Sequence, residues 1–171
     1  NTIGIVHLFH GMAEHMDRYD ELVNALNIQG YDVLRHNHRG HGKDIDEVER
    51  GHFESMSQIV DDAYEIVETL YGAELNVPYV VLGHSMGSII ARLFVMRYPE
   101  FADGLILTGT GMFPKWKGVP ATFALKLITM ILGKRRRVNW VNKLVNKSFN
   151  KRISNPLTES DWISTRRDEV E

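Results

Sequence analysis

Cysteine is absent from the 171 residues, which excludes disulfide bonds and thiolate metal sites. The sequence also has no run of about 18 or more apolar residues, so it offers no membrane-spanning helix. The lack of cysteine leaves the redox compartment open, and a cytoplasmic location is the simpler expectation. Neither an initiator methionine nor a signal peptide precedes the first apolar run, so we expect the start at Asn1 to be trimmed.

Acidic side chains are absent from one long stretch. Residues 115–152 hold no Asp or Glu but 11 Lys or Arg, whereas residues 1–114 hold 17 acids and 7 bases. This change of composition predicts a domain boundary, with a core domain at 1–114 and a second domain at 115–171. Binding of nucleic acid is not expected, because the basic stretch comes with neither stacking aromatics nor a known binding module.

Short apolar runs alternate with helical patterns in the first domain. Strands of this length between helices favour the α/β class, with a mostly parallel sheet and flanking crossover helices. Strands are predicted at 3–9, 31–35, 79–82 and 104–108, and helices at 18–29, from Ser55 onward and at 86–98. After residue 115 the pattern is helical only, which predicts the start of a helical cap. Its helices are expected at 123–132, near 140–149 and after Thr158.

The strongest local motif is Gly83-His84-Ser85-Met86-Gly87, which matches G-x-S-x-G between an apolar strand and a helix. A sharp strand-to-helix turn needs residues without bulk around the serine, and it exposes the Ser85 hydroxyl above the sheet. The Met86 N–H and the helix dipole can then meet a developing oxyanion. The alternative is a glycine-flanked turn with an inert serine.

A second backbone donor is expected from the loop after the first strand, where His10-Gly11-Met12 stands. An acyl-transfer site of this kind draws one oxyanion donor from such a loop. Gly11 allows the backbone to turn, so that the Met12 N–H can point at the site.

These motifs occur together in one order along the chain. They resemble the lysophospholipase and monoacylglycerol-lipase branch of the α/β-hydrolases, often grouped with serine-aminopeptidase-type hydrolases. The resemblance implies that Ser85 is the nucleophile, that the backbone N–H groups of Met12 and Met86 form the oxyanion hole, and that no cofactor is needed. The matching segments are His10–His15, Arg18-Tyr19, Gly30-Tyr31, His38–Gly42, Gly83–Gly87, Phe149–Arg152 and Asp161-Trp162.

Two positions depart from the family pattern. Asn37 stands where the family usually has an aspartate, and Asp44 stands where a small hydroxyl residue is common. Neither residue is expected to attack the substrate, so we expect local effects on stability. A zinc site built from the neighbouring histidines is the other reading of this loop, but no carboxylate or thiolate completes a ligand spacing, and a hydrogen-bonded structural loop is favoured. The histidines concerned are His36, His38, His41 and His52.

The triad acid and base are missing from the expected places. All eight histidines, from His7 to His84, precede Ser85, although in this fold the order is Ser, then Asp or Glu, then His. His84 adjoins the serine, but its side chain should point away. The remaining acids are not at the end of a late strand, and they are Asp103, Asp161 and Asp168. We therefore expect the C-terminal part of the fold to be missing and this chain alone to be inactive.

The interpretation from sequence is a serine hydrolase that cleaves a carboxylic ester of a lipid, a lysophospholipase or monoacylglycerol lipase, through an acyl-enzyme on Ser85. The alternatives are a small-ester esterase or an aminopeptidase of the same fold, and a non-catalytic binding protein of α/β-hydrolase type. Residues 115–152 suit either a peripheral membrane contact or a solvated cap. The sheet edge at 104–108 should be open, and we expect a partner chain, a symmetry mate or further residues to cover it.

Overall fold

The computed structural model describes residues 2–72, 75–111, 130, 133, 139–151, 153–155 and 158. The chain divides into two compact units, Asn1–Lys115 and Trp116–Glu171. The first unit carries the sheet and all the residues of the candidate site.

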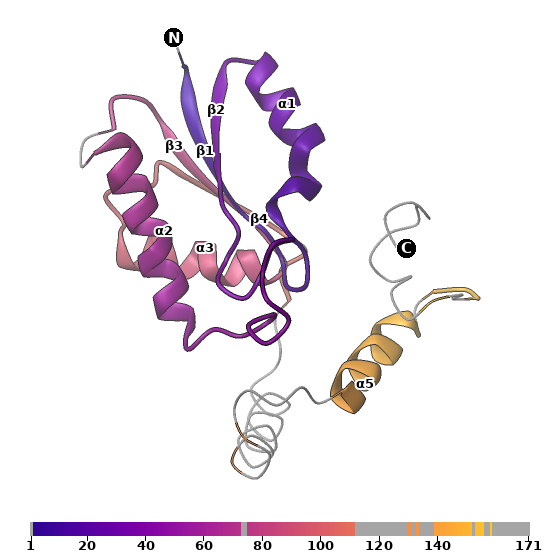
Figure 1. Ribbon diagram of the computed structural model, residues 1–171. Helices are drawn as coiled ribbons and strands as arrows, with labels where there is room; N and C mark the ends of the chain where they lie inside the picture. The colour runs from indigo at the N-terminus through magenta and orange to yellow at the C-terminus, as the bar shows by residue number, and fades with distance from the viewer. Residues whose placement is uncertain are drawn as a thin grey trace. The chain divides into compact units, whose positions relative to one another are not determined.

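Four parallel strands form the sheet of the first unit, in the order β2-β1-β3-β4 (Figure 1). Each strand coincides with a run of Val, Ile, Leu or aromatic residues, which fit a pleated and buried surface. The four strands predicted from the sequence are therefore confirmed, and the fold is of the α/β class with a parallel sheet. Their bounds are β1 Gly4–Phe9, β2 Tyr31–Arg35, β3 Tyr79–His84 and β4 Gly104–Thr108.

Helices cover both faces of this sheet. The chain steps from β1 to β2 in one direction and from β2 through β3 to β4 in the other, so right-handed crossovers place α1 on one face and α2 and α3 on the opposite face (Figure 1). The helix α2 begins as predicted, because Ser55 Oγ accepts a hydrogen bond of 3.1 Å from the Gln58 N–H. The bounds are a short 3-10 helix η1 Met16–Tyr19, α1 Asp20–Ile28, α2 Met56–Tyr71 and α3 Met86–Arg97.

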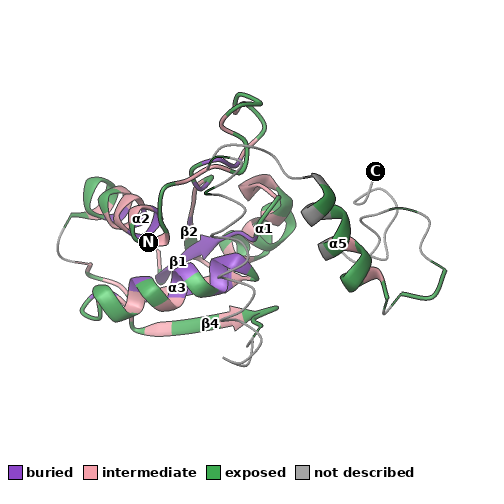
Figure 2. Cartoon of the chain, turned by 90° about the horizontal axis from the view of Figure 1, so that it is seen from below, coloured by how far each residue is buried: buried purple, intermediate pink, exposed green. Residues whose placement is uncertain are grey.

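The core lies between the sheet and the pair α2 and α3. Every residue of β1 is buried (Figure 2), and side chains from both helices pack against it. Leu70 shares one face of α2 with Ile59 and Ala63 by helical spacing, yet it is 61% exposed. The physical reason is its place in the last turn of α2, where it lines an open hollow beside the end of β2. The buried apolar side chains of the two helices are those of Ile59, Val60, Ala63, Val67, Met86, Ile90, Ala91 and Phe94.

The strand β4 lies at one edge of the sheet. Among the described residues it pairs with β3 alone, and Leu105 and Ile106 are 40% and 48% exposed (Figure 2). The neighbouring helix α3 exposes the large apolar side chains Ile89, Leu93 and Met96. An unpaired edge beside exposed apolar side chains is a template for pairing with another chain. Covering of this edge by other residues stays a prediction.

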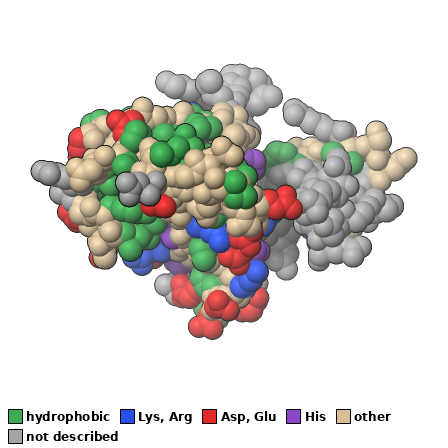
Figure 3. Space-filling view, turned by 90° about the horizontal axis from the view of Figure 1, so that it is seen from above, with side chains coloured by type: hydrophobic (Ala, Val, Ile, Leu, Met, Phe, Trp, Pro, Cys, Tyr) green, Lys and Arg blue, Asp and Glu red, His purple; other side chains and the backbone are tan. Residues whose placement is uncertain are grey.

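On the face that Figure 3 displays, Asp and Glu side chains are interspersed with Lys, Arg and apolar groups. The ion pairs of the first unit include Arg39, in the segment after β2, with Asp62 of α2, and Arg97 of α3 with Asp61 of α2. Exposed pairs of this kind contribute at most about 1 kcal/mol each to stability.

The second unit contains the described helix α5, Asn139–Asn150, which confirms the helix predicted near Trp140–Phe149. Its Trp140 and Leu144 are 57% and 61% exposed. The predicted placement of 115–152 over the strand ends, the helix at 123–132 apart from Met130, and the third helix beyond Thr158 lie outside the described residues. Within the described part of the chain, no helix has the length and hydropathy needed to cross a membrane.

Candidate active site

The candidate site lies where the direction of strand addition reverses. The chain leaves β1 toward β2 and leaves β3 toward β4, so β1 and β3 are neighbours whose following segments diverge. Phe9, the last residue of β1, is in register with Gly83 of β3. In open parallel sheets, ligands bind outside the carboxyl ends of the strands at such a point. The segments that follow these two strands are those containing Gly11 and Ser85.

Ser85 occupies the strand-to-helix turn that the sequence predicts. Its backbone angles are φ 52° and ψ −115°, a region that a residue with a side chain rarely adopts. The surroundings hold this strain, because the Ser85 N–H donates to the Thr108 carbonyl at 3.0 Å and the Ser88 hydroxyl donates to the Ser85 carbonyl at 2.6 Å. Ser85 is exposed at the start of α3, so its hydroxyl is accessible.

The two glycines of the motif are required by close packing. A Cβ atom on Gly83 would collide with the Gly87 carbonyl oxygen, and one on Gly87 would collide with the Phe9 carbonyl oxygen. The first turn of α3 therefore lies directly against the end of β1. This contact fixes the height of Ser85 above the sheet.

The loop after β1 reaches Ser85 as well. An ideal Cβ on Gly11 would lie 3.2 Å from Ser85 Cβ, so the backbone of this loop runs beside the serine. Met86 is buried as the first residue of α3, and the Met12 side chain is 62% exposed. The structure thus brings Ser85, Met12 and Met86 to the same strand ends. The roles of the two backbone N–H groups stay a prediction.

His84 and Asp103, the described residues considered above as triad partners, form hydrogen bonds with residues other than Ser85. His84 Nδ1 lies 2.9 Å from Thr108 Oγ1, which turns its ring away from Ser85 as expected. Asp103 Oδ2 accepts the N–H of Tyr79 at 2.8 Å, at the amino end of β3 and hence at the sheet edge opposite Ser85. In the described part of the chain no hydrogen bond joins Ser85 Oγ to a histidine. Asp161 and Asp168 lie outside the described residues.

Sequence reasoning missed one carboxylate beside the site. Glu14 is only 9% exposed in its side chain, and its carboxylate accepts the Gly11 N–H, the Tyr19 hydroxyl at 2.7 Å and the Arg18 guanidinium at 3.0 Å. These residues belong to segments recognised above by resemblance alone. The spacing of a glutamate three residues after a loop glycine and five before a tyrosine was the available signal.

A chain of hydrogen bonds links the core to the end of β2. His7 Nδ1 is bonded to the Tyr79 hydroxyl, and His7 Nε2 lies 3.3 Å from His36 Nδ1. Burial raises the pKa of Tyr79, so its hydroxyl stays protonated and donates a hydrogen bond to His7 Nδ1. His7 Nε2 then carries the proton and donates to His36 Nδ1, which leaves the proton of His36 on Nε2. Within the described residues that nitrogen has no partner.

The other loop histidines are bonded mainly to the backbone. His10 Nε2 accepts the His38 N–H at 3.1 Å, and His38 Nε2 lies 3.3 Å from the His10 carbonyl. His41 Nδ1 lies 3.0 Å from the Arg39 carbonyl. These contacts support the hydrogen-bonded loop. Within the described residues, no group of three His, Asp or Glu side chains could hold a metal ion.

Asn37 fastens the loop that follows β1. Its Oδ1 accepts the Met16 N–H at 2.9 Å, and the Arg35 guanidinium donates to the Met16 carbonyl at 2.9 Å. An aspartate would offer the same acceptor oxygen. The departure from the family pattern at this position therefore leaves the contact in place. Among the described residues, no contact of the Asp44 side chain explains the second departure.

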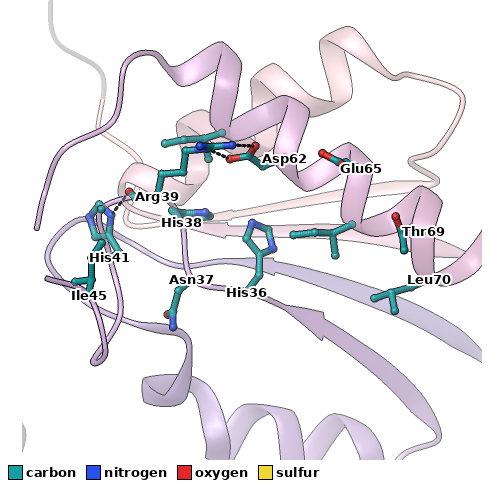
Figure 4. A pocket seen from close by; sticks show the side chains of 13 residues that line it. His36, Asn37, His38, Arg39, His41, Ile45, Asp62, Glu65, Thr69 and Leu70 are labelled. Carbon is teal, nitrogen blue, oxygen red and sulfur yellow. Dashed lines mark hydrogen bonds and ion pairs between the residues drawn. The ribbon is translucent and has the colours of Figure 1, made fainter. Parts of the chain in front are cut away.

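A hollow of about 700 Å³ lies near these histidines, between the segment after β2 and helix α2 (Figure 4). His36 and the ion pair of Arg39 with Asp62 face it, the pair being bonded through two contacts of 2.5 and 2.8 Å. Neither Ser85 nor Met12 lines this hollow. The exposed serine and the hollow are therefore separate features.

The buried histidines predict a loss of stability in mild acid. Burial, with the nearby His10, lowers the pKa of His36 to about 4, and burial with the same neighbour lowers the pKa of His38 to about 2. Above about pH 6.5 both folded and unfolded chains hold these rings neutral. Between pH 6.5 and 4 the unfolded chain binds more protons, so the free energy of unfolding should fall by about 1 kcal/mol per pH unit for each ring.

Urea denaturation of the full-length protein between pH 7 and 4.5 measures this slope. His36→Gln should make it shallower by the contribution of one ring. Thr69→Ser, which alters the same hollow without removing a titrating group, should keep the slope of the parent. An unchanged slope in His36→Gln would show that this ring is charged in the folded protein.

Comparison with known proteins places this geometry in a known group. The sequence family described as serine aminopeptidase, S33, matches residues 1–171. The monoglyceride lipase of Mus musculus is 33% identical over 132 residues, which cover 75% of this chain and 42% of that protein. A probable lysophospholipase L2 of Haemophilus influenzae is 32% identical over 102 residues, 59% of this chain and 33% of that protein.

A solved structure agrees with these relatives. A thermostable carboxyl esterase from Bacillus coagulans, in complex with glycerol, superposes with a TM-score of 0.80 at 32% identity. The match covers 99% of this chain and 56% of the esterase. The chain thus spans a third to somewhat over half of the proteins that it resembles.

Proposed function

The chain belongs to the serine aminopeptidase S33 family of α/β-hydrolases, and from this premise we propose that the whole protein hydrolyses carboxylic esters with Ser85 as its nucleophile. The observation that carries the proposal is the strained, exposed position of Ser85 at the carboxyl end of β3, beside the Gly11 loop. Strain of this kind persists where the surroundings over-determine it, as at catalytic sites.

The proposed reaction follows from this placement. The Ser85 hydroxyl attacks the ester carbonyl, and the negative oxygen of the tetrahedral intermediate accepts the N–H groups of Met12 and Met86. Collapse releases the alcohol and leaves an acyl group on Ser85, which water then removes as the carboxylic acid. The general base that takes the serine proton is assigned to the part of the protein outside this chain, because no described histidine is hydrogen-bonded to Ser85 Oγ and the adjacent His84 is bonded to Thr108.

The proposed substrate is a lipid ester with a small alcohol, a monoacylglycerol or a lysophospholipid. The names of the similar proteins support this class, and the esterase structure holds glycerol. A fluorophosphonate probe tests the nucleophile, since it labels an activated serine and should modify Ser85 in the full-length protein. An intact Ser85 after exposure to the probe would favour the non-catalytic alternative.

The family description also keeps an aminopeptidase as a second candidate. Rates on p-nitrophenyl esters of increasing acyl length separate the two activities. A lipid esterase should gain in kcat/KM as the acyl chain lengthens, because each buried methylene contributes about 0.8 kcal/mol. Faster turnover of an aminoacyl anilide than of any ester would favour the peptidase.

A peripheral membrane contact through 115–152 is the proposed role of the basic stretch. On α5, Trp140 and Leu144 are exposed, and Lys143 and Lys147 are exposed beside them, a composition typical of helices that lie at lipid interfaces. We expect the full-length protein to bind vesicles containing phosphatidylserine, with binding that falls steeply as salt rises. Replacing both lysines with glutamine should weaken it. Binding to neutral vesicles equal to that on phosphatidylserine vesicles would favour the interpretation of 115–152 as a solvated cap.

A further inference from the structure

We propose that Glu14 is the positioning residue of the oxyanion hole: its carboxylate, 9% exposed, holds the Gly11–Ala13 turn so that the Met12 N–H faces the oxyanion formed at Ser85. This inference rests on the proposed function, because it assigns a role within the same site. Glu14 itself touches no reacting atom.

The first support is the set of donors that meet at Glu14. One carboxylate oxygen accepts both the Gly11 N–H and the Tyr19 hydroxyl, and the other accepts the Arg18 guanidinium. Burying a carboxylate is costly unless hydrogen bonds and an opposite charge compensate it. Three donors to one buried side chain, two of them from side chains further along the chain, fix its position closely.

The second support is the backbone between the two anchored ends. Ala13 has φ 61°, a left-handed conformation that is unfavourable for a residue with a Cβ. The turn is closed by the bond from the Gly11 N–H to the Glu14 carboxylate, so this side chain stabilises the unfavourable conformation. Met12 lies inside the closed turn. Its N–H direction is therefore set by the bond that Glu14 makes.

The third support is the short path from Glu14 to the serine. An ideal Cβ on Gly11 would lie 2.7 Å from Glu14 Oε1 and 3.2 Å from Ser85 Cβ. Gly11 is thus held between the carboxylate and the nucleophile, with no intervening side chain. A shift of the carboxylate would move the neighbour of Ser85 directly.

The far side of the turn is anchored to the sheet. The Met16 backbone is bonded to Asn37 and to Arg35, both at the end of β2. Burial, together with the bond to Glu14, raises the pKa of Tyr19, so its hydroxyl remains a donor across the working pH range. The residues that hold Glu14 are therefore themselves fixed by hydrogen bonds, as the support of a positioning residue should be.

The test compares Glu14→Ala and Glu14→Gln in the full-length protein. Loss of one oxyanion donor lowers kcat by about 10²–10³, and we expect this loss in Glu14→Ala with little change in KM. Glu14→Gln keeps an oxygen that accepts both the Gly11 N–H and the Tyr19 hydroxyl, so its kcat should recover to within about tenfold of the parent. Asp62→Ala is the matched control, since it removes the carboxylate of an ion pair that lines the separate hollow and should keep kcat.

A transition-state analogue separates positioning from general loosening. A trifluoromethyl ketone forms a tetrahedral oxyanion on the serine, and its affinity should fall in Glu14→Ala by the same factor as kcat. The affinity for a fatty-acid product should stay unchanged. If Glu14→Ala does not fold, Glu14→Asp provides the same comparison, because its shorter carboxylate cannot reach both Gly11 and Tyr19.

Two results would overturn the inference. One is a kcat of Glu14→Ala within about threefold of the parent. The other is an equal loss of affinity for the ketone and the fatty acid, which would mark a purely structural role. Failure of the proposed function itself is distinguishable, because the fluorophosphonate probe would then leave Ser85 unlabelled in the parent protein.

Discussion

Replacing Ser85 with alanine in the full-length protein should lower kcat for a monoacylglycerol ester by about 10⁶, the loss found when a triad serine is removed elsewhere. The cause is the missing oxygen that forms the acyl-enzyme. The fold should survive, because the bonds that hold the turn run through the Ser85 backbone N–H and carbonyl. Ester turnover and thermal unfolding, measured on the same preparation, check both statements.

The matched control for this variant is Ser57→Ala. Ser57 is an exposed serine on α2 whose hydroxyl accepts a hydrogen bond from Arg97. Its loss should leave kcat unchanged and alter stability by less than about 1 kcal/mol. Retention of more than about one hundredth of the parent kcat in Ser85→Ala would show that another group attacks the ester.

The chain of residues 1–171, purified alone, should hydrolyse a short-chain ester about 10⁶ times more slowly than the full-length protein. Removing a triad histidine has an effect of that size, because the serine hydroxyl stays protonated and is then a weak nucleophile. The strained turn at Ser85 and the loop of Gly11 and Met12 both lie within residues 1–171, so we expect this chain to bind an ester without cleaving it.

Ester turnover, measured on a sample of residues 1–171 whose mass has been verified, checks this expectation. Turnover within tenfold of the full-length protein would mean that a histidine upstream of Ser85 serves as the base. The His84→Gln variant then identifies or excludes the adjacent ring, which the structure shows bonded to Thr108.

Local patterns were sufficient to predict the strands and the elbow. The strands β1 and β3 are predicted by their apolar runs, and the turn at Ser85 is predicted by the glycines around it. Both features depend on residues close together in the sequence, so a local pattern is enough. The exposure of Leu70 could not be predicted, since helical spacing does not show which side chains line an open hollow.

The hydrogen bonds to the Glu14 carboxylate were not predicted, nor were those that run from Tyr79 through His7 to His36. Both depend on side chains that meet only after folding. A buried histidine and a surface histidine look alike in a sequence, because hydrogen-bond partners far along the chain decide which is stable inside. The same limit applies to Asn37, whose contact with Met16 joins the end of β2 to the loop after β1.

The pairing of β1 with β3 has a consequence for biosynthesis. His7 and Tyr79, bonded between these strands, stand 72 positions apart, so the ribosome must release both before the sheet can form. Contacts between such distant residues form late, because the entropy of closing a long loop opposes them. Until then Ser85 has neither its strained turn nor the Gly11 loop beside it, and its hydroxyl is as unreactive as that of any serine in a nascent polypeptide. The geometry proposed for catalysis is therefore absent from the growing chain until both strands have left the ribosome.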